Sequence, residues 1–481
     1  MKLVGRKEEI KLLESLYSSG NAEFVAMYGR RRVGKTFLLG ELFRSRMTFW
    51  HTGLPPYDRD RTYLLRDQLQ AFHYSLEEYG LKGYQCPTSW LEAFHQLTIL
   101  LKQKDNGSRQ VVFIDELPWM DTARSRFIPA FEQFWNGWAS RRSNIMLIVC
   151  GSATSWMTDN LINNKGGLYN RLTREIKLSP FKLNECEKFL KAKGVAMSRY
   201  EIAQAYMILG GIPHYFNFFE KGNSLAQSID KMFFAENAPL RFEYQRLFGS
   251  LFTSPSLPMK IVELLATKRQ GFSRREILEK VGVQDSGSFS DVMNALQSSD
   301  LIVQYKPFGE SKRKEKFKLT DNFCLFNLKF ADAIKKNSSQ YWQKNYNSSK
   351  LNAWRGFAFE EVCFAHIQQI KKALGFSSVS STQSGWILQG SENTTGTQID
   401  MIIERGDNIV NLCEIKYYGK QYTIDKAYDE ILRNRLQTLI DRLPRKKTVH
   451  LTMITTFGLS PNEYSGQIQS LVTLDDLFMD E

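Results

Sequence analysis

The sequence predicts an α/β protein whose first part is a parallel β-sheet covered by helices. Three short apolar runs, residues 24–28, 111–114 and 145–149, have the length and composition of buried strands. Stretches of helical character separate them, which is typical of strands joined by crossover helices. A further set of strands between helices is expected in residues 351–481. The chain should therefore contain two α/β parts with helical modules between them.

Length and composition indicate a large globular protein. The chain has 481 residues, enough for about three or four domains. Hydrophobic residues make up 42% and charged residues 24%, which excludes wholesale disorder. The net charge of +13 favours a polyanionic partner such as DNA, although a soluble surface that is simply basic would give the same excess.

The cysteines, histidines and apolar runs point to the cytoplasm. None of the six cysteines forms a C-x-x-C pair, as expected for reduced thiols in a cytosolic protein. The six histidines show no zinc-ligand spacing. The chain begins Met-Lys-Leu-Val-Gly-Arg without an apolar signal core, and the run at 145–150 is too short to span a bilayer. We therefore expect a cytoplasmic protein with no membrane partner.

A glycine-rich loop follows the first predicted strand. Residues 29–36 spell G-R-R-R-V-G-K-T and fit the phosphate-binding pattern G-x-x-x-x-G-K-[ST] at every position. The glycines let backbone N–H groups face the phosphates, and the next helix adds its positive N-terminal end. Lys35 should reach the β- and γ-phosphates and Thr36 should ligate Mg²⁺. The predicted nucleotide-binding residues are Gly29, Arg30, Arg31, Arg32, Val33, Gly34, Lys35 and Thr36.

The second predicted strand ends in two acids, V-V-F-I-D-E. Asp115 would hold the water shell of Mg²⁺, and Glu116 would orient or deprotonate the attacking water. Taken alone, the pair would also fit a helix N-cap after a strand. Joined to the loop, it predicts an ATPase with a P-loop NTPase sheet and the cofactors ATP and Mg²⁺.

Other polar residues are weaker candidates for the same site. Ser152 follows the third strand, where it would contact the γ-phosphate or the attacking water, or simply cap the next helix. Arg171 and Arg174, in L-Y-N-R-L-T-R-E-I, are candidate arginine fingers in cis or in a neighbouring subunit. The alternative for both arginines is a solvated basic pair.

The motifs together resemble the archaeal-type ATPases of the AAA+/STAND class. The residues that carry this resemblance are V-G-R-K-E-E, the phosphate loop, I-D-E-L-P-W, G-S-A-T-S, L-Y-N-R-L-T-R-E and G-G-I-P-H-Y, from residue 2 to beyond 320. The resemblance implies an α/β ATPase core, a helical lid and a winged helix. It also implies that Gly5 and Arg6 lie near the adenine.

Residues 257–320 have the pattern of a winged helix-turn-helix. Helices are expected at 259–266, at 274–281 with Ser273 as N-cap, and at 289–298, followed by strands at 301–305 and 317–319. The loop between the strands is basic, which suits phosphate contacts without sequence readout. Asp291 in the third helix disfavours sequence-specific binding, and a protein-interaction or lid role is equally compatible. The basic residues are Lys306, Lys312, Arg313, Lys314, Lys316 and Lys318.

Acids and a lysine in the last segment form a second candidate site. Glu414 and Lys416 share one face of a strand because they are two residues apart. With Asp400 on the preceding strand and Glu360 on the first helix, they resemble the PD-(D/E)xK nuclease fold, with Ile399 in place of the usual proline. This resemblance implies that Asp400 and Glu414 bind Mg²⁺; Gln437 is a weaker candidate. The alternative is ordinary surface charge on strands.

The sequence thus predicts a P-loop ATPase core (1–180), a helical lid (181–252), a winged helix-turn-helix (253–335), a linker (336–350) and a restriction-endonuclease-like α/β domain (351–481, DUF234-like). The predicted function is an ATP-regulated, Mg²⁺-dependent nuclease acting on nucleic acid. The alternative is a nucleotide-switched DNA-binding or signalling ATPase whose last domain only binds a partner. Self-association or a partner protein is a further expectation, as a trigger of hydrolysis.

Overall fold

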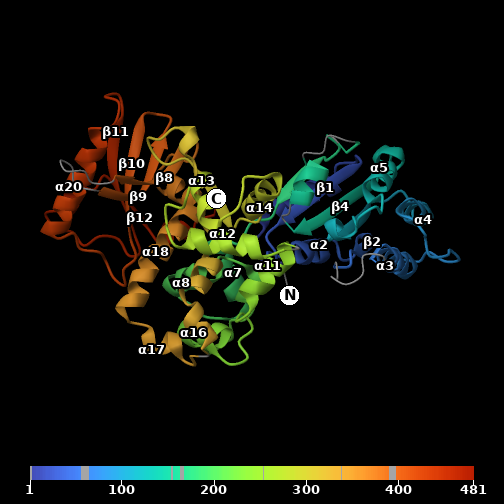
Figure 1. Cartoon of the computed structure of the whole chain (residues 1–481), viewed down its shortest axis with the longest axis horizontal. Coiled ribbons are helices and arrows are strands. Elements are labelled where there is room, and N and C mark those ends of the chain that lie inside the picture. Colours follow the sequence, from blue (N-terminus) through green and yellow to red (C-terminus); the bar gives the residue numbers. More distant parts are fainter. Residues whose placement is uncertain are drawn as a thin grey trace. The chain divides into compact units, whose positions relative to one another are not determined.

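The computed structural model describes residues 3–55, 64–152, 155–162, 167–168, 170–252, 254–336, 338–388 and 397–480 (Figure 1). The chain divides into two compact units. The first comprises residues 1–179 and 290–300, and the second comprises residues 180–289 and 301–481.

The first unit is built on a five-stranded parallel sheet in the order β2-β3-β4-β1-β5. The strands are β1 (Glu23–Gly29), β2 (Met47–Thr52), β3 (Gln110–Asp115), β4 (Ile145–Ser152) and β5 (Arg174–Lys177). The three strands predicted from apolar runs are confirmed as β1, β3 and β4. They are neighbours in the centre of the sheet, so their carboxyl ends meet at one edge.

Helices of the first unit cover the sheet, as the α/β prediction requires. They are α1 (Lys7–Tyr17), α2 (Lys35–Phe43), α3 (Leu64–Glu78), α4 (Trp90–Gln103), α5 (Phe127–Gly137) and the short α6 (Ser155–Met157). Helices α3, α4 and α5 pack on one face of the sheet through a core rich in aromatic rings (Figure 1). For example, Phe24 of β1 contacts Phe131 and Trp135 of α5. This apolar layer holds the strands that carry the polar residues at the sheet edge.

The second unit begins with the predicted helical segment. It contains α7 (Leu183–Lys193), α8 (Arg199–Leu209), α9 (Pro213–Phe216), α10 (Leu225–Ile229) and α11 (Glu243–Leu251). Ser198 and Glu201 form a capping box at the start of α8. The helix ends at Gly210, whose φ of 67° is the left-handed conformation that terminates many helices. A short break at residues 210–212 separates α8 from α9.

Residues 253–335 contain the elements predicted for a winged helix-turn-helix. These are α12 (Ser256–Ala266), α13 (Arg274–Val281), α14 (Gly287–Ser298), and the antiparallel strands β6 (Ile302–Tyr305) and β7 (Lys316–Leu319). Ser273 caps α13 as predicted. Most of α14 belongs to the first unit, so the assembly of these elements into a winged helix stays a prediction.

The segment predicted as a linker contains packed structure. It follows α15 (Asn322–Lys329) and α16 (Ala331–Lys335), and it holds α17 (Tyr341–Asn345). Trp342 is fully buried against Phe330 and Trp354. Asp230 accepts hydrogen bonds from the backbone N–H of Trp342 at 2.7 Å and of Gln343 at 3.1 Å. The prediction of an exposed linker is therefore wrong for these residues, because the buried side chain of Trp342 holds an otherwise polar stretch against the rest of the unit.

The C-terminal part contains a mixed five-stranded sheet in the order β12-β11-β10-β9-β8. Strand β9 is antiparallel to both β8 and β10, whereas β10, β11 and β12 are parallel. Its elements are α18 (Ser349–Ala365), α19 (Ile367–Ala373), β8 (Ser381–Leu388), β9 (Thr397–Arg405), β10 (Ile409–Lys416), α20 (Lys426–Ile440), β11 (Thr448–Thr455) and β12 (Ser470–Thr473). This agrees with the expected set of strands between helices in residues 351–481.

A search of the described helices finds none that is both long enough and apolar enough to cross a membrane.

Candidate functional site

The phosphate loop has the geometry that the sequence predicts. It connects β1 to α2, and Gly34 at the start of α2 has a φ of 95°, which a side chain would strain. The ammonium group of Lys35 donates to the carbonyl oxygen of Gly29 at 3.0 Å and lies 3.4 Å from that of Arg30. The lysine is buried and curls over the loop. Its charge therefore lies inside the cradle that is predicted to bind phosphates.

Gly29 allows the loop to leave the sheet. A Cβ atom at this position would lie 2.3 Å from the carbonyl oxygen of Leu178. That oxygen is backbone and cannot rotate away, and the N–H of Leu178 in turn donates to the carbonyl of Tyr28 at 2.7 Å. Glycine is thus required by close packing between the end of β1 and the segment after β5.

Asp115 and Thr36 meet at the carboxyl edge of the sheet. The Thr36 hydroxyl donates to Oδ2 of Asp115 at 2.6 Å. The other carboxylate oxygen of Asp115 accepts from the backbone N–H of Glu116 at 3.0 Å. Ser152 lies at the end of β4, the strand between β1 and β3. Hydroxyl and carboxylate oxygens are the ligands that Mg²⁺ prefers, so these residues fit the predicted ion.

Glu116 is held in an unusual conformation. Its φ of 49° is left-handed, which is uncommon for a residue with a side chain. Burial raises the pKa of its carboxyl group, and the charge of Asp115 raises it further, while Lys35 and a hydrogen bond from the Ser152 backbone act in the opposite direction. A carboxylate of increased basicity beside the phosphate loop is suited to accept a proton from water.

Arg6 connects the N-terminal segment to the loop. Its guanidinium group donates to the carbonyl of Val33 at 3.0 Å and to that of Ser179 at 2.6 Å. Both Gly5 and Arg6 have left-handed φ angles, of 70° and 57°. These bonds give Arg6 a role in holding the loop, and the contact of Gly5 and Arg6 with adenine stays a prediction.

The two candidate arginine fingers lie away from the loop's edge of the sheet. Arg174 begins β5 opposite Val25, whereas the phosphate loop follows Gly29. Arg171 precedes the strand, and both side chains are exposed. Their placement favours contact with another molecule over contact with nucleotide in the same chain. Residues 153, 154 and 169 of the associated motifs lie outside the described residues.

The second candidate site lies at the point where β9 and β10 separate. Asp400 of β9 accepts a hydrogen bond from the backbone N–H of Ile415 at 3.0 Å. Glu414 of β10 is buried, and Lys416, two residues further, lies 2.9 Å from its Oε1 atom. The structure thus brings together the two acids and the lysine predicted from the sequence.

Helix α20 adds two residues that sequence reasoning missed. The Arg435 guanidinium binds Oε2 of Glu414, and the Tyr428 hydroxyl donates to Oε1. Their spacing of seven residues places both on one helix face, a signal that could have been read from the sequence. Gln437 is exposed and donates to Asp441 at 2.7 Å, so the structure does not bring this weaker candidate to the site.

The acids of this site differ in their protonation. Burial raises the pKa of Asp400 to about 6, with a contribution from Glu414. Burial, together with the charge of Asp400, raises the pKa of Glu360 to about 7. Burial alone would raise the pKa of Glu414 too, but attraction to Lys416 and Arg435 holds it below its usual value. Glu414 is therefore the acid of this site that stays charged to the lowest pH.

Glu360 connects this site to the segment predicted as a winged helix. Its carboxylate lies 3.1 Å from Arg269, which follows α12 and stacks on Phe357 at 3.2 Å from the ring centroid. Next to it, Glu361 lies 3.1 Å from Lys318 of β7. To contact DNA as predicted, Lys318 would have to leave its ion pair with Glu361.

The β6–β7 hairpin also contacts the C-terminal sheet. Phe308 packs edge-on against Trp386 of β8, with 6.2 Å between the ring centroids. Of the other basic residues in the hairpin, Lys314 pairs with Glu310, whereas Lys306 and Arg313 are exposed. Only part of the predicted basic surface is therefore open to a phosphate backbone.

The donor set of this site fits Mg²⁺ through two carboxylates. Within the described part of the chain, no group of three or more His, Cys, Asp or Glu side chains lies close enough to hold a metal ion. Mg²⁺ is commonly held by one or two carboxylates and keeps several waters, so Asp400 and Glu414 suffice as oxygen donors. Glu360, bonded to Arg269, would act outside that pair.

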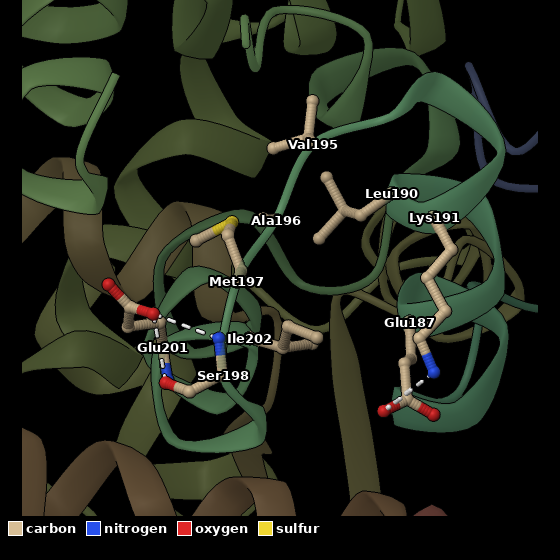
Figure 2. A pocket seen from close by; sticks show the side chains of 9 residues that line it. All are labelled: Glu187, Leu190, Lys191, Val195, Ala196, Met197, Ser198, Glu201 and Ile202. Carbon is tan, nitrogen blue, oxygen red and sulfur yellow. Dashed lines mark hydrogen bonds and ion pairs between the residues drawn. The ribbon is translucent and has the colours of Figure 1, made fainter. Parts of the chain in front are cut away.

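A separate pocket of about 480 Å³ opens between α7 and α8 (Figure 2). Its charged side chains have partners within the lining: Glu201 accepts from the Ser198 hydroxyl at 2.8 Å, and Lys191 lies 3.4 Å from Glu187. None of the predicted site residues lines it. The lining residues are Glu187, Leu190, Lys191, Val195, Ala196, Met197, Ser198, Glu201 and Ile202.

The sheet order, the phosphate loop and the acids opposite it define the first unit as a P-loop ATPase domain. In agreement, residues 3–218 match the model of a protein family described as an ATPase domain predominantly from Archaea. This part of the chain is therefore an archaeal-type ATPase domain.

Individual proteins are similar over longer or shorter stretches. An uncharacterized protein of Methanocaldococcus jannaschii, MJECL04, is 24% identical over 439 residues, which cover 89% of this chain and 91% of that protein. The uncharacterized ATP-binding protein MJ0423 of the same organism is 42% identical over 43 residues, 9% of this chain and 73% of that protein. The Walker-type ATPase PABY2304 of Pyrococcus abyssi has a TM-score of 0.48 and 18% identity, covering 68% of this chain and 96% of that one.

Proposed function

We propose that this protein hydrolyses ATP and acts on nucleic acid as an ATP-regulated, Mg²⁺-dependent nuclease. In the ATPase domain, Lys35 would bind the β- and γ-phosphates, and Thr36 and Asp115 would hold Mg²⁺. Glu116 would accept the proton of the attacking water, and Ser152 would contact the γ-phosphate or that water. The raised pKa of Glu116 and its place beside Asp115 support this assignment.

The observation that carries the nuclease proposal is the meeting of Asp400, Glu414 and Lys416 at the separation of β9 and β10. A divalent ion held by the two acids would polarise a phosphodiester and lower the pKa of a water molecule. Lys416 would orient that water or stabilise the charge that develops on the phosphate. Glu360 would position the second shell of water.

Coupling between the two activities is part of the proposal. ATP binding would order the helical segment 181–252 and expose the C-terminal site, and hydrolysis would reset it. The net charge of +13 and the exposed Lys306 and Arg313 support nucleic acid as the partner. Arg171 or Arg174, from a second copy or a partner protein, would trigger hydrolysis.

The test is cleavage of plasmid and single-stranded DNA with Mg²⁺ or Mn²⁺, with and without ATP. Wild-type protein is compared with Glu414→Ala and Lys416→Ala, and all three should hydrolyse ATP equally. Cleavage should disappear in both variants. Equal cleavage by a variant would refute the site assignment, and no cleavage by folded, ATP-hydrolysing wild type would refute the nuclease.

One observation favours a second candidate, a nucleotide-switched protein whose C-terminal domain only binds a partner. Both oxygens of Glu414 are already bonded to groups of the protein itself. A mobility shift with DNA, with and without ATP at two salt concentrations, tests this alternative. Binding without cleavage would support it, and no binding in any condition would count against both candidates.

A further inference from the structure

Arg435 occupies an oxygen of Glu414 that a metal ion would need. Its guanidinium Nη1 bonds to Oε2 of Glu414, while Lys416 and Tyr428 share Oε1. Glu414 has 1% of its side chain exposed and Arg435 has 19%. The pair is therefore largely shielded from water, where an ion pair is stronger than at the surface.

Within the described part of the chain, Glu414 is the main partner of Arg435, and Tyr428 and Asp400 add weaker electrostatic attraction. The guanidinium carries five N–H donors, and its bond to Glu414 is the one hydrogen bond found for it among the described residues. Its helix position makes no ion pair along α20, in contrast to Arg433, which binds Asp429 four residues earlier at 2.7 Å. Several donors of Arg435 thus stay available on the partly exposed side of the site.

Without a metal ion, the site carries no excess of negative charge. Acidic and basic side chains are equal in number: Glu360, Asp400 and Glu414 against Arg269, Lys416 and Arg435. A divalent cation next to Glu414 would leave an excess of positive charge and would repel the nearest guanidinium. A phosphodiester brings the negative charge that restores the balance, and planar guanidinium groups bind phosphate oxygens through paired N–H donors.

We propose that Arg435 is a positioning residue that exchanges partners: it binds Glu414 in the metal-free protein and binds the DNA phosphate when a divalent ion takes its place on Glu414. This inference rests on the proposed nuclease function. Arg435 keeps Glu414 oriented between reactions, and it makes metal binding and DNA binding mutually dependent. Arg435 and the metal ion compete for Oε2, whereas the metal ion and DNA cooperate.

The first measurement is Mn²⁺ binding to the full chain by calorimetry, with Glu414→Ala as the baseline for ions bound elsewhere. Arg435→Gln should bind Mn²⁺ about tenfold more tightly than wild type, because the ion no longer has to displace the guanidinium group from Glu414. Tenfold in affinity corresponds to about 1.4 kcal/mol of binding free energy. Arg435→Lys keeps the charge and should stay near wild type. Arg433→Gln on the same helix is the matched control and should change nothing.

The second measurement is binding of a short fluorescent DNA duplex with Ca²⁺, a hard ion that also takes oxygen ligands. Arg435→Gln should bind DNA about five- to tenfold more weakly with Ca²⁺, since a charge-assisted contact to phosphate is lost. Without Ca²⁺ the difference between the wild type and the variant should be much smaller, because Arg435 is then held by Glu414. A purely structural role would not give opposite changes in the affinities for metal ion and DNA.

Each other outcome has a definite meaning. Unchanged or weaker Mn²⁺ binding by folded Arg435→Gln would overturn the exchange and leave the nuclease proposal standing. Tighter Mn²⁺ binding with unchanged DNA affinity would also overturn it, because Arg435 would then only block the ion. If neither wild type nor Arg435→Gln binds Mn²⁺ beyond the Glu414→Ala baseline, the exchange and the metal-dependent nuclease both fail. Two controls show that each variant is folded: it hydrolyses ATP as wild type does, and it unfolds on heating at the same temperature as wild type.

Discussion

At the scale of single residues, the two sites differ in how their acids are satisfied. Asp115 accepts bonds from Thr36 of the phosphate loop and from the backbone of its own neighbour Glu116. Glu414 accepts bonds from side chains of two different elements, β10 and α20. The first arrangement could be predicted because its partners lie in short motifs. The second depends on how α20 packs, so Arg435 escaped prediction although its neighbours Asp400, Glu414 and Lys416 did not.

Glu116→Gln should separate ATP binding from hydrolysis. The amide cannot accept the proton of water, so turnover should fall about 100- to 1,000-fold. Binding should persist or tighten, because the repulsion between Glu116 and Asp115 is removed. Phosphate release and binding of labelled ATP measure the two effects, with the exposed Glu8→Gln as control. Turnover within threefold of wild type would show that another group activates the water.

The raised pKa of Asp400 predicts a pH-dependent loss of stability in metal-free buffer. Its folded pKa of about 6 exceeds the usual value of about 3.9, so the folded state holds the proton more tightly than the unfolded state. The stabilisation is complete below about pH 4 and is lost as the pH rises through about 6. Glu360, with its pKa of about 7, should act in the same direction.

Asp400→Asn removes this titration and keeps an oxygen that can accept from Ile415. Relative to wild type, the variant should gain stability between about pH 4.5 and pH 7.5, by up to about 3 kcal/mol. Calorimetric unfolding with EDTA at both pH values measures the difference. If the stability difference between the variant and wild type were the same at the two pH values, burial would not raise the pKa of Asp400 as the structure indicates.

At the scale of elements, the sequence predicted those whose own residues define them. The buried strands β1, β3 and β4 and the capped helix α13 were predicted because apolar runs and a capping box are local signals. Strand β2 was missed because it is irregular, with a register shift between Met47 and Phe49. Strand β5 has a single buried residue, Ile176, so its sequence carries almost no pattern.

The predicted linker shows how one residue overrides composition. Residues 336–350 are polar, yet Trp342 buries its whole side chain among aromatic rings. Trp342→Ala should therefore destabilise the second unit by about 3–5 kcal/mol. Lys344→Ala on the same helix is exposed and should change stability by less than about 0.5 kcal/mol. If the two variants had equal urea midpoints, Trp342 would not stabilise the unit and residues 336–350 would behave as the predicted linker.

At the scale of the whole molecule, the two candidate sites belong to different compact units. The nucleotide site lies in the unit of residues 1–179, whereas Glu414, Arg435 and the β6–β7 hairpin belong to the other. The helical segment 181–252 is in the same unit as the C-terminal sheet, and its Tyr200 stacks on Tyr417 just after β10 at 4.9 Å. A signal from ATP to the second site must therefore pass from one unit to the other. The helical segment 181–252 directly follows the ATPase sheet in the chain and belongs to the second unit, so it is the candidate to carry that signal.

This division predicts that ATP control and cleavage can be separated by one substitution. Lys35→Ala removes the charge that we propose binds the β- and γ-phosphates, so ATP should no longer change the rate of DNA cleavage. Cleavage measured without ATP should match wild type, because Lys35 lies in the other unit. Glu116→Gln should instead respond to ATP and stay in the ATP-bound state, since it binds without hydrolysing. If ATP changed cleavage by Lys35→Ala as much as by wild type, the control would not run through the phosphate loop, and the coupling of the two units would have to be abandoned even if both activities were real.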